Sequence, residues 1–286
     1  MAPSSPTVAN WALGLRLKEK REEAGLSGIA AAKYIGITGA YLSEVEKGKK
    51  NLSSDRMSAV IESYEFSEEE ADELRALRDD ASQRGWWNSY SAIFSDELLR
   101  FFGYEHGAES LHTYDSGLMN GLLQTEDYAR AVIESGSPNV RLAEAERRIK
   151  ARLTRQRRLR GEDPLRISAV MSEAVLRQQV GGAAVLKAQL EHLADLVDEL
   201  QDTLEVLVVP FEATGHHAMG GSAFHIMTFP SGRLPTLLWQ ETVTSTNLIT
   251  DSLTVREYAL AHAEAAKAAL SREDSLQLIR SIFRSL

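Results

Sequence analysis

Three glycines divide the first part of this 286-residue chain into short helical segments. Between Leu13 and Leu77 the apolar residues recur at helical spacing, and the pattern breaks at Gly25, Gly36 and Gly48. Glycine ends a helix readily because it lacks a Cβ atom and adopts the left-handed conformation that closes the last turn. The pattern therefore predicts a compact all-helical domain. Its five helices are expected at residues 9–24, 27–35, 38–47, 53–64 and from Ser67 onward.

The rest of the chain alternates helical stretches with short runs of β-branched and aliphatic residues. We expect four strands, at residues 165–171, 204–211, 223–229 and 236–241. Turns rich in Gly and Pro separate the last three, which favours an antiparallel meander. The fold is therefore expected to be mainly α, with an α+β part that contains a small, mostly antiparallel sheet. Further helices are expected at residues 125–134, 140–160, 173–180, 183–200, 255–270 and 271–283.

Length and composition indicate two folded domains. The chain has about twice the usual length of one domain, and 43% of its residues are hydrophobic, which is ample for packed cores. The connection between the domains contains Trp86 and Trp87, which a flexible linker would not normally carry. We expect both rings to pack against the second domain, with an aromatic platform as the alternative. The expected limits are a disordered tail at 1–9, the helical domain at 10–78, a connector at 79–95 and the α+β domain at 96–286.

Composition excludes several classes of protein. The absence of cysteine rules out a disulfide scaffold, thiol catalysis and cysteine-ligated zinc. The first residues have neither the basic start nor the apolar segment of a secretory leader. No uncharged apolar run approaches the roughly 18 residues that span a bilayer. These features predict a cytoplasmic protein without a membrane partner.

The formal net charge of −9 is unevenly distributed along the chain. Residues 11–60 carry nine Lys or Arg against six acids, a local charge of +3. Residues 141–160 carry nine against two, a local charge of +7, so the rest of the chain sums to −19. The acidic remainder repels the phosphates of nucleic acid, and any binding to DNA must therefore be local, at a basic surface.

The segment from Gly28 to Gly48 fits two short helices joined by a tight turn. Ala32 is small where the helices approach, Gly36 permits the turn, and Thr38 can cap the second helix. The shared apolar core would come from Ala31, Ile35, Ile37, Leu42 and Val45. A second helix placed in this way can meet base edges in a DNA major groove. It would present to solvent Gly39, Ala40, Ser43, Glu44 and Lys47.

At these residues the chain resembles the helix-turn-helix domains of the xenobiotic-response-element class of transcriptional regulators, which are related to phage repressors. The resemblance covers residues 10–76 and implies a five-helix, λ-repressor-like domain with double-stranded DNA as its partner. It also implies that Glu46 is structural and pairs with a base of the first helix such as Arg16. The resemblance rests on Ala32, Gly36, Leu42, the run Ser43-x-x-Glu46-x-Gly48 and the Leu-x-x-x-Arg21 pattern of the first helix.

Two departures from that class affect the expected contacts with DNA. Gly28 stands where the class commonly has a phosphate-contacting Gln, so a backbone contact would replace it. The exposed face of the second helix lacks Arg, Asn and Gln, the side chains that contact bases in a bidentate manner, so recognition would also depend on DNA shape. The residues expected at the bases are Thr38, Gly39, Ala40, Tyr41, Ser43 and Lys47. Phosphate contacts are expected from Lys33, Lys49 and Lys50.

The second domain resembles the domain of unassigned activity in antitoxin-like bacterial transcriptional regulators. A proline usual before the first matching segment is Asn120 here. The resemblance implies a transcription factor of developmental or secondary-metabolism circuits, often encoded beside a small partner protein. With the helix-turn-helix it covers nearly the whole chain. The matching segments, in the order of the family, are residues 121–133, 152–159, 171–182, 189–196 and 206–229.

The sequence leaves three roles open for the second domain: sensing a ligand in a pocket, docking the small partner protein, or forming a dimer. A homodimer is expected because one helix-turn-helix rarely binds tightly enough, whereas two half-sites roughly 34 Å apart do. We therefore predict a sequence-specific DNA-binding regulator. The alternative is a protein-interaction adaptor whose helix-turn-helix no longer binds DNA.

Several signals in the second domain have simple structural explanations. Thr125, which two acids follow, is expected to cap a helix. The arginines of residues 140–160 are expected on a solvated or acid-paired face, with a second phosphate-contacting surface as the alternative. An apolar seam is expected to pack against the sheet rather than form a coiled coil. The seam consists of Leu186, Leu190, Leu193, Val197 and Leu200.

Catalysis is not expected. The chain has no nucleotide-binding, zinc-protease or nucleophile-elbow motif, and no paired carboxylates or activated nucleophile stand out. His216, His217 and His225 lie in a Gly-rich region without a recognised metal-ligand spacing, so we expect a loop or a mobile lid there rather than a metal site. The chain is therefore predicted not to be an enzyme and to need no cofactor.

Overall fold

The computed structural model describes residues 2–136, 142–242 and 245–286. Met1, the start of the expected tail, and Val140, the start of one expected helix, lie outside the described residues. In the part of the chain that is described, no helix has both the length and the apolar character needed to cross a lipid bilayer.

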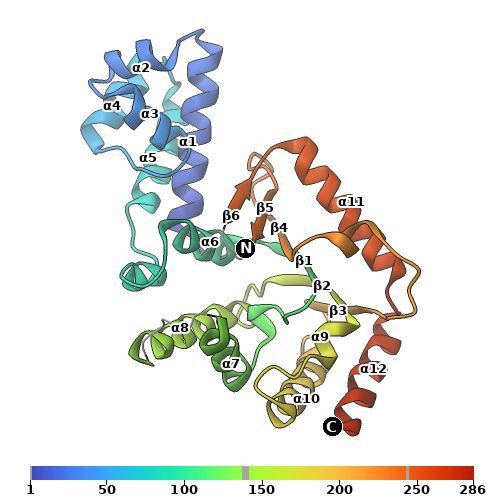
Figure 1. Ribbon diagram of the computed structural model, residues 1–286. Helices are drawn as coiled ribbons and strands as arrows, with labels where there is room; N and C mark the ends of the chain where they lie inside the picture. Colours follow the sequence, from blue (N-terminus) through green and yellow to red (C-terminus); the bar gives the residue numbers. More distant parts are fainter. Residues whose placement is uncertain (1, 137–141, 243–244) are drawn as a thin grey trace. The chain divides into compact units, whose positions relative to one another are not determined.

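The chain divides into two compact units (Figure 1). Helix α6 (Asp96–Gly107) contributes residues to both of them. The expected domain limits, with a connector at 79–95, stay a prediction. The first unit comprises residues 3–89 and 102–107, and the second comprises residues 90–101 and 108–286 with Ala2.

The first unit contains the five helices that the glycine pattern predicts. At each N-cap a side-chain oxygen accepts a hydrogen bond from a backbone N–H three residues further on. Gly25, Gly36 and Gly48 have φ angles of 66°, 66° and 65°, the left-handed conformation that favours glycine. The all-helical part of the predicted fold is confirmed. The helices are α1 (Pro6–Glu23), α2 (Gly28–Tyr34), α3 (Gly39–Glu46), α4 (Ser54–Ser63) and α5 (Glu68–Ala81).

Helix α1 begins earlier than the sequence predicts. Ser5 caps it, and Pro6 occupies the first turn, where the missing N–H of proline costs no helical hydrogen bond. Residues 6–9, expected in a disordered tail, are therefore helical.

Helix α6 lies where the sequence predicts no helix. Two glycines, Gly103 and Gly107, weaken its helical pattern because glycine is a poor helix former. A Cβ atom at Gly103 would overlap the side chain of Thr7, so glycine is what lets α1 pass close to α6 at this point. The Ser5 hydroxyl also donates a hydrogen bond of 2.6 Å to the Gly103 carbonyl oxygen. Tertiary packing thus outweighs the low helical propensity of this segment.

The two tryptophans pack on residues of α6. Trp86 stacks on Phe102 with ring centroids 5.8 Å apart, and Trp87, which is buried, lies against His106 with centroids 5.4 Å apart. Both partners lie within residues 96–286, the range expected for the second domain, but they are part of the first compact unit, so the expected packing against the second unit is not what these contacts show.

The second unit contains a six-stranded sheet with the strand order β3-β2-β1-β4-β5-β6. Strands β1, β2 and β3 are parallel to one another, whereas β4 is antiparallel to β1, β5 to β4 and β6 to β5. This architecture confirms the predicted fold class of a helical domain followed by an α+β domain. The strands are β1 (Ser110–Asp115), β2 (Arg166–Ser172), β3 (Leu204–Val209), β4 (Phe224–Thr228), β5 (Leu237–Glu241) and β6 (Thr246–Ile249).

The predicted meander is right for β4 and β5 and wrong for β3. Strand β3 pairs with β2 in parallel, with Ala169 opposite Val206, because helices between these strands return the chain to the same edge of the sheet. The sequence predicts neither β1 nor β6. In β1, the residues Ser110, His112 and Asp115 make the segment too polar to match an aliphatic strand pattern.

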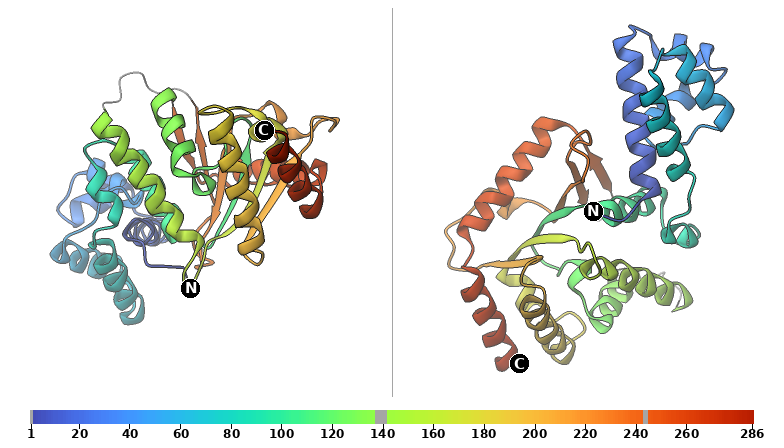
Figure 2. Two further views of the ribbon diagram at one scale, coloured as in Figure 1. Left: turned by 90° about the horizontal axis from the view of Figure 1, so that it is seen from below. Right: turned by 180° about the vertical axis from the view of Figure 1, so that it is seen from behind.

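Helices cover both faces of this sheet. Figures 1 and 2 show α7, α8 and α10 on one side and α11 on the other. The expected helices are confirmed, except that α8 ends at Arg155, where a 3-10 turn (Gln156–Leu159) follows, and α9 ends three residues early. Their bounds are α7 (Glu126–Gly136), α8 (Leu142–Arg155), α9 (Glu173–Arg177), α10 (Ala183–Glu199), α11 (Ser252–Ala268) and α12 (Arg272–Ser285).

The apolar seam of α10 lies in the core of the second unit. Leu186, Leu190 and Leu193 are fully buried, and Val197 is nearly so. The helix contacts α12, α7 and β3. Packing within the unit, rather than a coiled coil, therefore explains the seam, as predicted.

Candidate functional site

The turn between α2 and α3 has a fixed geometry. Gly36 adopts its left-handed conformation, and the N–H of Ile37 donates to the Ala32 carbonyl oxygen at 2.9 Å, which closes the end of α2. Thr38 then caps α3 by accepting a hydrogen bond from the Tyr41 N–H at 3.1 Å. The predicted core is confirmed, since Ala31, Ala32, Ile35, Leu42 and Val45 are buried and Ile37 packs against them.

Helix α3 is anchored on α1 by an ion pair. The Arg21 guanidinium donates to both oxygens of Glu46, at 2.6 and 2.9 Å, and to the Leu26 carbonyl oxygen at 2.9 Å. The carboxylate raises the pKa of Arg21. Glu46 is therefore structural and pairs with a base of the first helix, as the resemblance implies, but that base is Arg21 and not Arg16. Arg16 lies on another face of α1, because five residues turn a helix by about 140°, and it pairs with Glu70 at 3.3 Å.

The exposed surface around α3 contains most of the predicted DNA-contacting residues. Thr38, Gly39, Ala40 and Lys47 are exposed, whereas Tyr41, Ser43 and Glu44 are half-buried. Lys33 on α2 and Lys49 and Lys50 after α3 are also exposed. Most of these side chains are therefore accessible to a partner, and their contact with DNA stays a prediction.

The loop after α3 is held in place by its own hydrogen bonds. The N–H groups of Lys49 and Lys50 donate to the Glu44 carbonyl oxygen at 2.8 and 3.2 Å, and the Asn10 side chain donates to the Gly48 carbonyl oxygen at 2.8 Å. Glycine is required at position 48, since a Cβ atom there would lie 2.6 Å from the Cα atom of Trp11. The loop therefore presents its lysines from a fixed backbone.

Two cations lie near the ring of Tyr41. Its hydroxyl donates to the Asn51 carbonyl oxygen at 2.8 Å. The Lys50 ammonium is 5.5 Å from the ring centroid, and the Arg56 guanidinium is 5.4 Å from it. The Tyr41 hydroxyl is therefore already hydrogen-bonded, and its ring adjoins a small basic cluster.

Two exposed residues near α3, Arg56 and Ile29, are not among the DNA-contacting residues that the sequence predicts. Arg56 follows the Ser53 cap at the start of α4, and its place in a basic stretch is the signal that could have found it. Ile29 is 82% exposed and lies beside α3, since a Cβ atom at Gly39 would be 4.0 Å from its Cγ1 atom. The sequence feature that could have found Ile29 is its position, because this large apolar residue lies outside the buried stripe of Ala31, Ala32 and Ile35.

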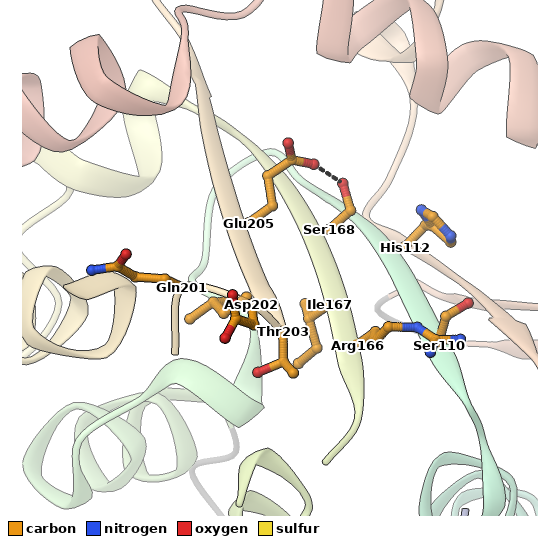
Figure 3. Close-up of a pocket in the computed structure, with 10 residues that line it drawn as sticks. Ser110, His112, Arg166, Ile167, Ser168, Gln201, Asp202, Thr203 and Glu205 are labelled. Atoms are coloured by element: carbon orange, nitrogen blue, oxygen red, sulfur yellow. Dashed lines mark hydrogen bonds between the residues drawn. The ribbon is translucent and has the colours of Figure 1, made fainter. Parts of the chain in front are cut away.

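The second unit has a groove at the amino ends of its parallel strands, with a volume of about 350 Å³. Figure 3 shows His112, Ser168 and Glu205 on neighbouring strands, with the Ser168 hydroxyl donating to Glu205 at 2.8 Å. The His112 ring meets that of His262 edge to face, with centroids 5.2 Å apart. Burial lowers the pKa of both histidines, so the groove favours their neutral form. Its lining can donate and accept hydrogen bonds, as a polar ligand requires.

The segment from Met119 to Thr125 is a buried structural loop. The Gln189 side chain accepts from the Thr125 N–H at 2.7 Å and donates to the Leu123 carbonyl oxygen at 2.8 Å. Gln124 donates to the Met119 carbonyl oxygen at 2.6 Å. The Thr125 hydroxyl accepts from the Tyr128 N–H at 3.3 Å, which confirms the predicted helix cap.

The basic segment at residues 141–160 contains both acid-paired and buried arginines. Arg148 pairs with Glu144 at 2.7 Å, as an acid-paired face predicts. Arg155 and Arg158 contradict that prediction, because they are buried. Arg158 donates to the carbonyl oxygens of Ala108 and Asp163 at 2.9 and 2.8 Å, so it holds loops together.

The three histidines near β4 have separate neighbours. His217 pairs with Glu264 at 3.0 Å, His216 lies 3.4 Å from the Tyr114 hydroxyl, and the His225 ring meets that of Phe101. In the described part of the chain, no three His, Cys, Asp or Glu residues are grouped so that they could hold a metal ion.

Comparison with known families finds one match in each part of the chain. Residues 12–74 match the helix-turn-helix domain family, so the first unit is a helix-turn-helix domain, the class of fold that its turn and exposed helix define. Residues 98–281, more than half of the chain, match the family described as a domain of unknown function (DUF5753), and the chain belongs to this family. No curated protein and no solved structure matches the chain.

Proposed function

We propose that the protein is a sequence-specific transcriptional regulator of the xenobiotic-response-element class, which binds double-stranded DNA with α3 in the major groove. The observation that carries the proposal is the exposed face of α3, at Thr38, Gly39 and Ala40, on a rigidly packed helix-turn-helix. The match to the helix-turn-helix family supports it, since that fold suggests DNA binding.

The distribution of cations supports the same function. Lys33 lies on the helix before the turn, and Lys49 and Lys50 follow α3, so exposed ammonium groups flank the recognition helix in the sequence. Phosphates of DNA on either side of a major groove are the partners that such cations position. The proposal therefore assigns phosphate contacts to these lysines and base contacts to Thr38, Gly39, Ala40, Tyr41, Ser43 and Lys47.

The proposal extends to the assembly and to the second unit. We propose a cytoplasmic homodimer that binds two half-sites, in an antitoxin-like system with a small partner protein encoded nearby. The second unit would sense a ligand or dock this partner, and the groove beside His112 and Glu205 favours a small polar ligand. No catalytic step and no cofactor are assigned to the protein.

The first experiment incubates the purified full-length protein with sheared DNA from its own source and sequences the fragments retained at physiological salt. Enrichment of a few fragments that share an inverted repeat is the expected result. Retention without any common sequence, or no retention, would contradict a sequence-specific dimeric regulator. It would favour the alternative, an adaptor whose helix-turn-helix binds protein, and a pull-down with the full-length chain would then test that alternative.

A further inference from the structure

We infer that the protein recognises thymine through its 5-methyl group, using an apolar patch made of Ile29, Thr38 and Ala40. The inference rests on the proposed function and names the feature of the base pair that the recognition surface reads. Thymine is the base whose major-groove edge carries a methyl group, so apolar side chains distinguish it from the other three bases.

Ile29 is the part of the patch that folding does not explain. It is 82% exposed and lies outside the buried stripe of α2, so its side chain adds little to the core. It lies beside the start of α3, since a Cβ atom at Gly39 would be 4.0 Å from its Cγ1 atom. A large apolar side chain therefore adjoins the turn of α3 that would enter the groove first.

The first turn of α3 offers apolar groups and no long polar side chain. Ala40 presents a methyl group, and Gly39 presents only backbone. The Thr38 hydroxyl accepts a hydrogen bond from the Tyr41 N–H, so its methyl group is the part not engaged by the cap. The Tyr41 hydroxyl donates to the Asn51 carbonyl oxygen. Bidentate reading of guanine or adenine has no suitable side chain here, whereas a methyl contact needs none.

The surroundings of the patch favour DNA over an apolar protein segment as its occupant. Lys33 lies four residues after Ile29 and thus on the same side of α2, and it is exposed. The cluster of Lys50 and Arg56 at Tyr41 adds further positive charge near α3. A small apolar patch among cations is complementary to thymine methyl groups among phosphates.

The test uses DNA fragments that the full-length protein retains from the pool described above. Each fragment is resynthesised with deoxyuridine at one thymine position at a time, which removes only the methyl group. For the wild type we expect affinity to fall about fourfold at each contacted thymine, the effect of losing one buried methyl-sized group. In the Ile29→Ala variant, deoxyuridine should no longer lower the affinity at one or more of these positions in each half-site.

Tyr34→Ala is the matched control. Tyr34 is 69% exposed on the same helix, but it lies five residues from Ile29 and therefore on another side of α2. It should keep the wild-type response to deoxyuridine, and both variants should unfold at the wild-type temperature.

The outcomes separate the inference from the proposed function. Selective retention with unchanged affinity for every deoxyuridine fragment overturns the inference and leaves the proposed function standing. A wild-type loss that Ile29→Ala does not alter at any position also overturns it. Failure to retain any common sequence contradicts the proposed function and the inference together.

Discussion

The two basic segments of this chain use positive charge in different ways. In residues 11–60, with a local charge of +3, every charged side chain is at least partly exposed. In the segment at 141–160, with +7, Arg155 and Arg158 are buried, and Arg158 donates to backbone carbonyl oxygens. The more basic segment therefore contains buried arginines, whereas the less basic one contains none. A sum of charges therefore does not locate a phosphate-binding surface, whereas the position of each side chain relative to the core does.

Asp115 is a buried acid, and its replacement should give the largest change in the free energy of unfolding. It is buried in the second unit, and burial raises its pKa to about 7 from a normal value near 3.9. Between these two values the folded state holds a proton that the unfolded state has lost, so the contribution of Asp115 to stability falls as the pH rises through this range.

Asp115→Asn should therefore stabilise the protein relative to the wild type by about 4 kcal/mol more at pH 8 than at pH 4. Urea unfolding of both proteins at the two pH values measures this difference. Equal differences at both pH values would show that the carboxyl does not titrate as its burial implies.

Glu46 tests whether the first unit also depends on a shielded charge. Its side chain is 10% exposed and that of Arg21 is 11% exposed. Glu46→Ala leaves the Arg21 guanidinium without its main partner, so we expect the free energy of unfolding to fall by about 3 kcal/mol. Glu22→Ala is the control, because Glu22 also pairs with Arg21, at 3.5 Å, but is exposed, and its loss should cost at most about 0.5 kcal/mol.

Charge reversal at exposed lysines tests the comparison most directly. Lys47→Glu should weaken specific binding to a retained DNA fragment about 100-fold, since it replaces an attraction near the groove by a repulsion. Lys150→Glu is the matched control, because Lys150 is exposed on α8 in the more basic segment. Its affinity should equal that of the wild type in an equilibrium titration. Similar losses for both variants would mean that α8 also binds DNA.

Removal of a buried arginine should change stability and not binding. Arg158→Ala leaves the carbonyl oxygens of Ala108 and Asp163 without this donor, at an expected cost of about 2 kcal/mol in unfolding free energy. Urea unfolding measures the cost, and a titration at fixed salt should give the wild-type affinity for DNA. A loss of affinity with unchanged stability would assign Arg158 to the DNA surface instead.

The smallest effect is expected in the salt dependence of binding. Alanine at Lys33, Lys49 or Lys50 should reduce the slope of log affinity against log salt by about one for each phosphate that the variant no longer neutralises. Titrations at several salt concentrations give the slope. An unchanged slope for all three variants would remove the phosphate contacts from the proposal.

Local signals predict the first unit well. Gly36 and the Thr38 cap lie a few residues apart, and hydrogen bonds within the same short segment determine their conformation. The sequence therefore predicts the five helices and the buried face of α2 and α3, and the resemblance to a known class implies the structural role of Glu46. It does not predict the partner of Glu46, because the choice between Arg16 and Arg21 depends on the rotation of α1 about its axis.

Long-range packing decides what the sequence does not predict in the second unit. Strand β1 is a polar segment that becomes a central strand because β2 and β4 pair with it on either side. The parallel pairing of β3 with β2 likewise depends on the path of the helices between them. At the candidate site, a helical pattern shows which residues are buried. It does not show which exposed residues adjoin another helix, and the sequence therefore does not single out Ile29.

The loop after α3 has a thermodynamic consequence for association. Its backbone is already fixed by the Glu44 carbonyl oxygen and by the Asn10 side chain. Ordering of this loop is part of folding, so association with a partner should lose little backbone entropy at Lys49 and Lys50. Only their flexible side chains remain to be immobilised, and the association step can remain fast because the loop needs no rearrangement before contact.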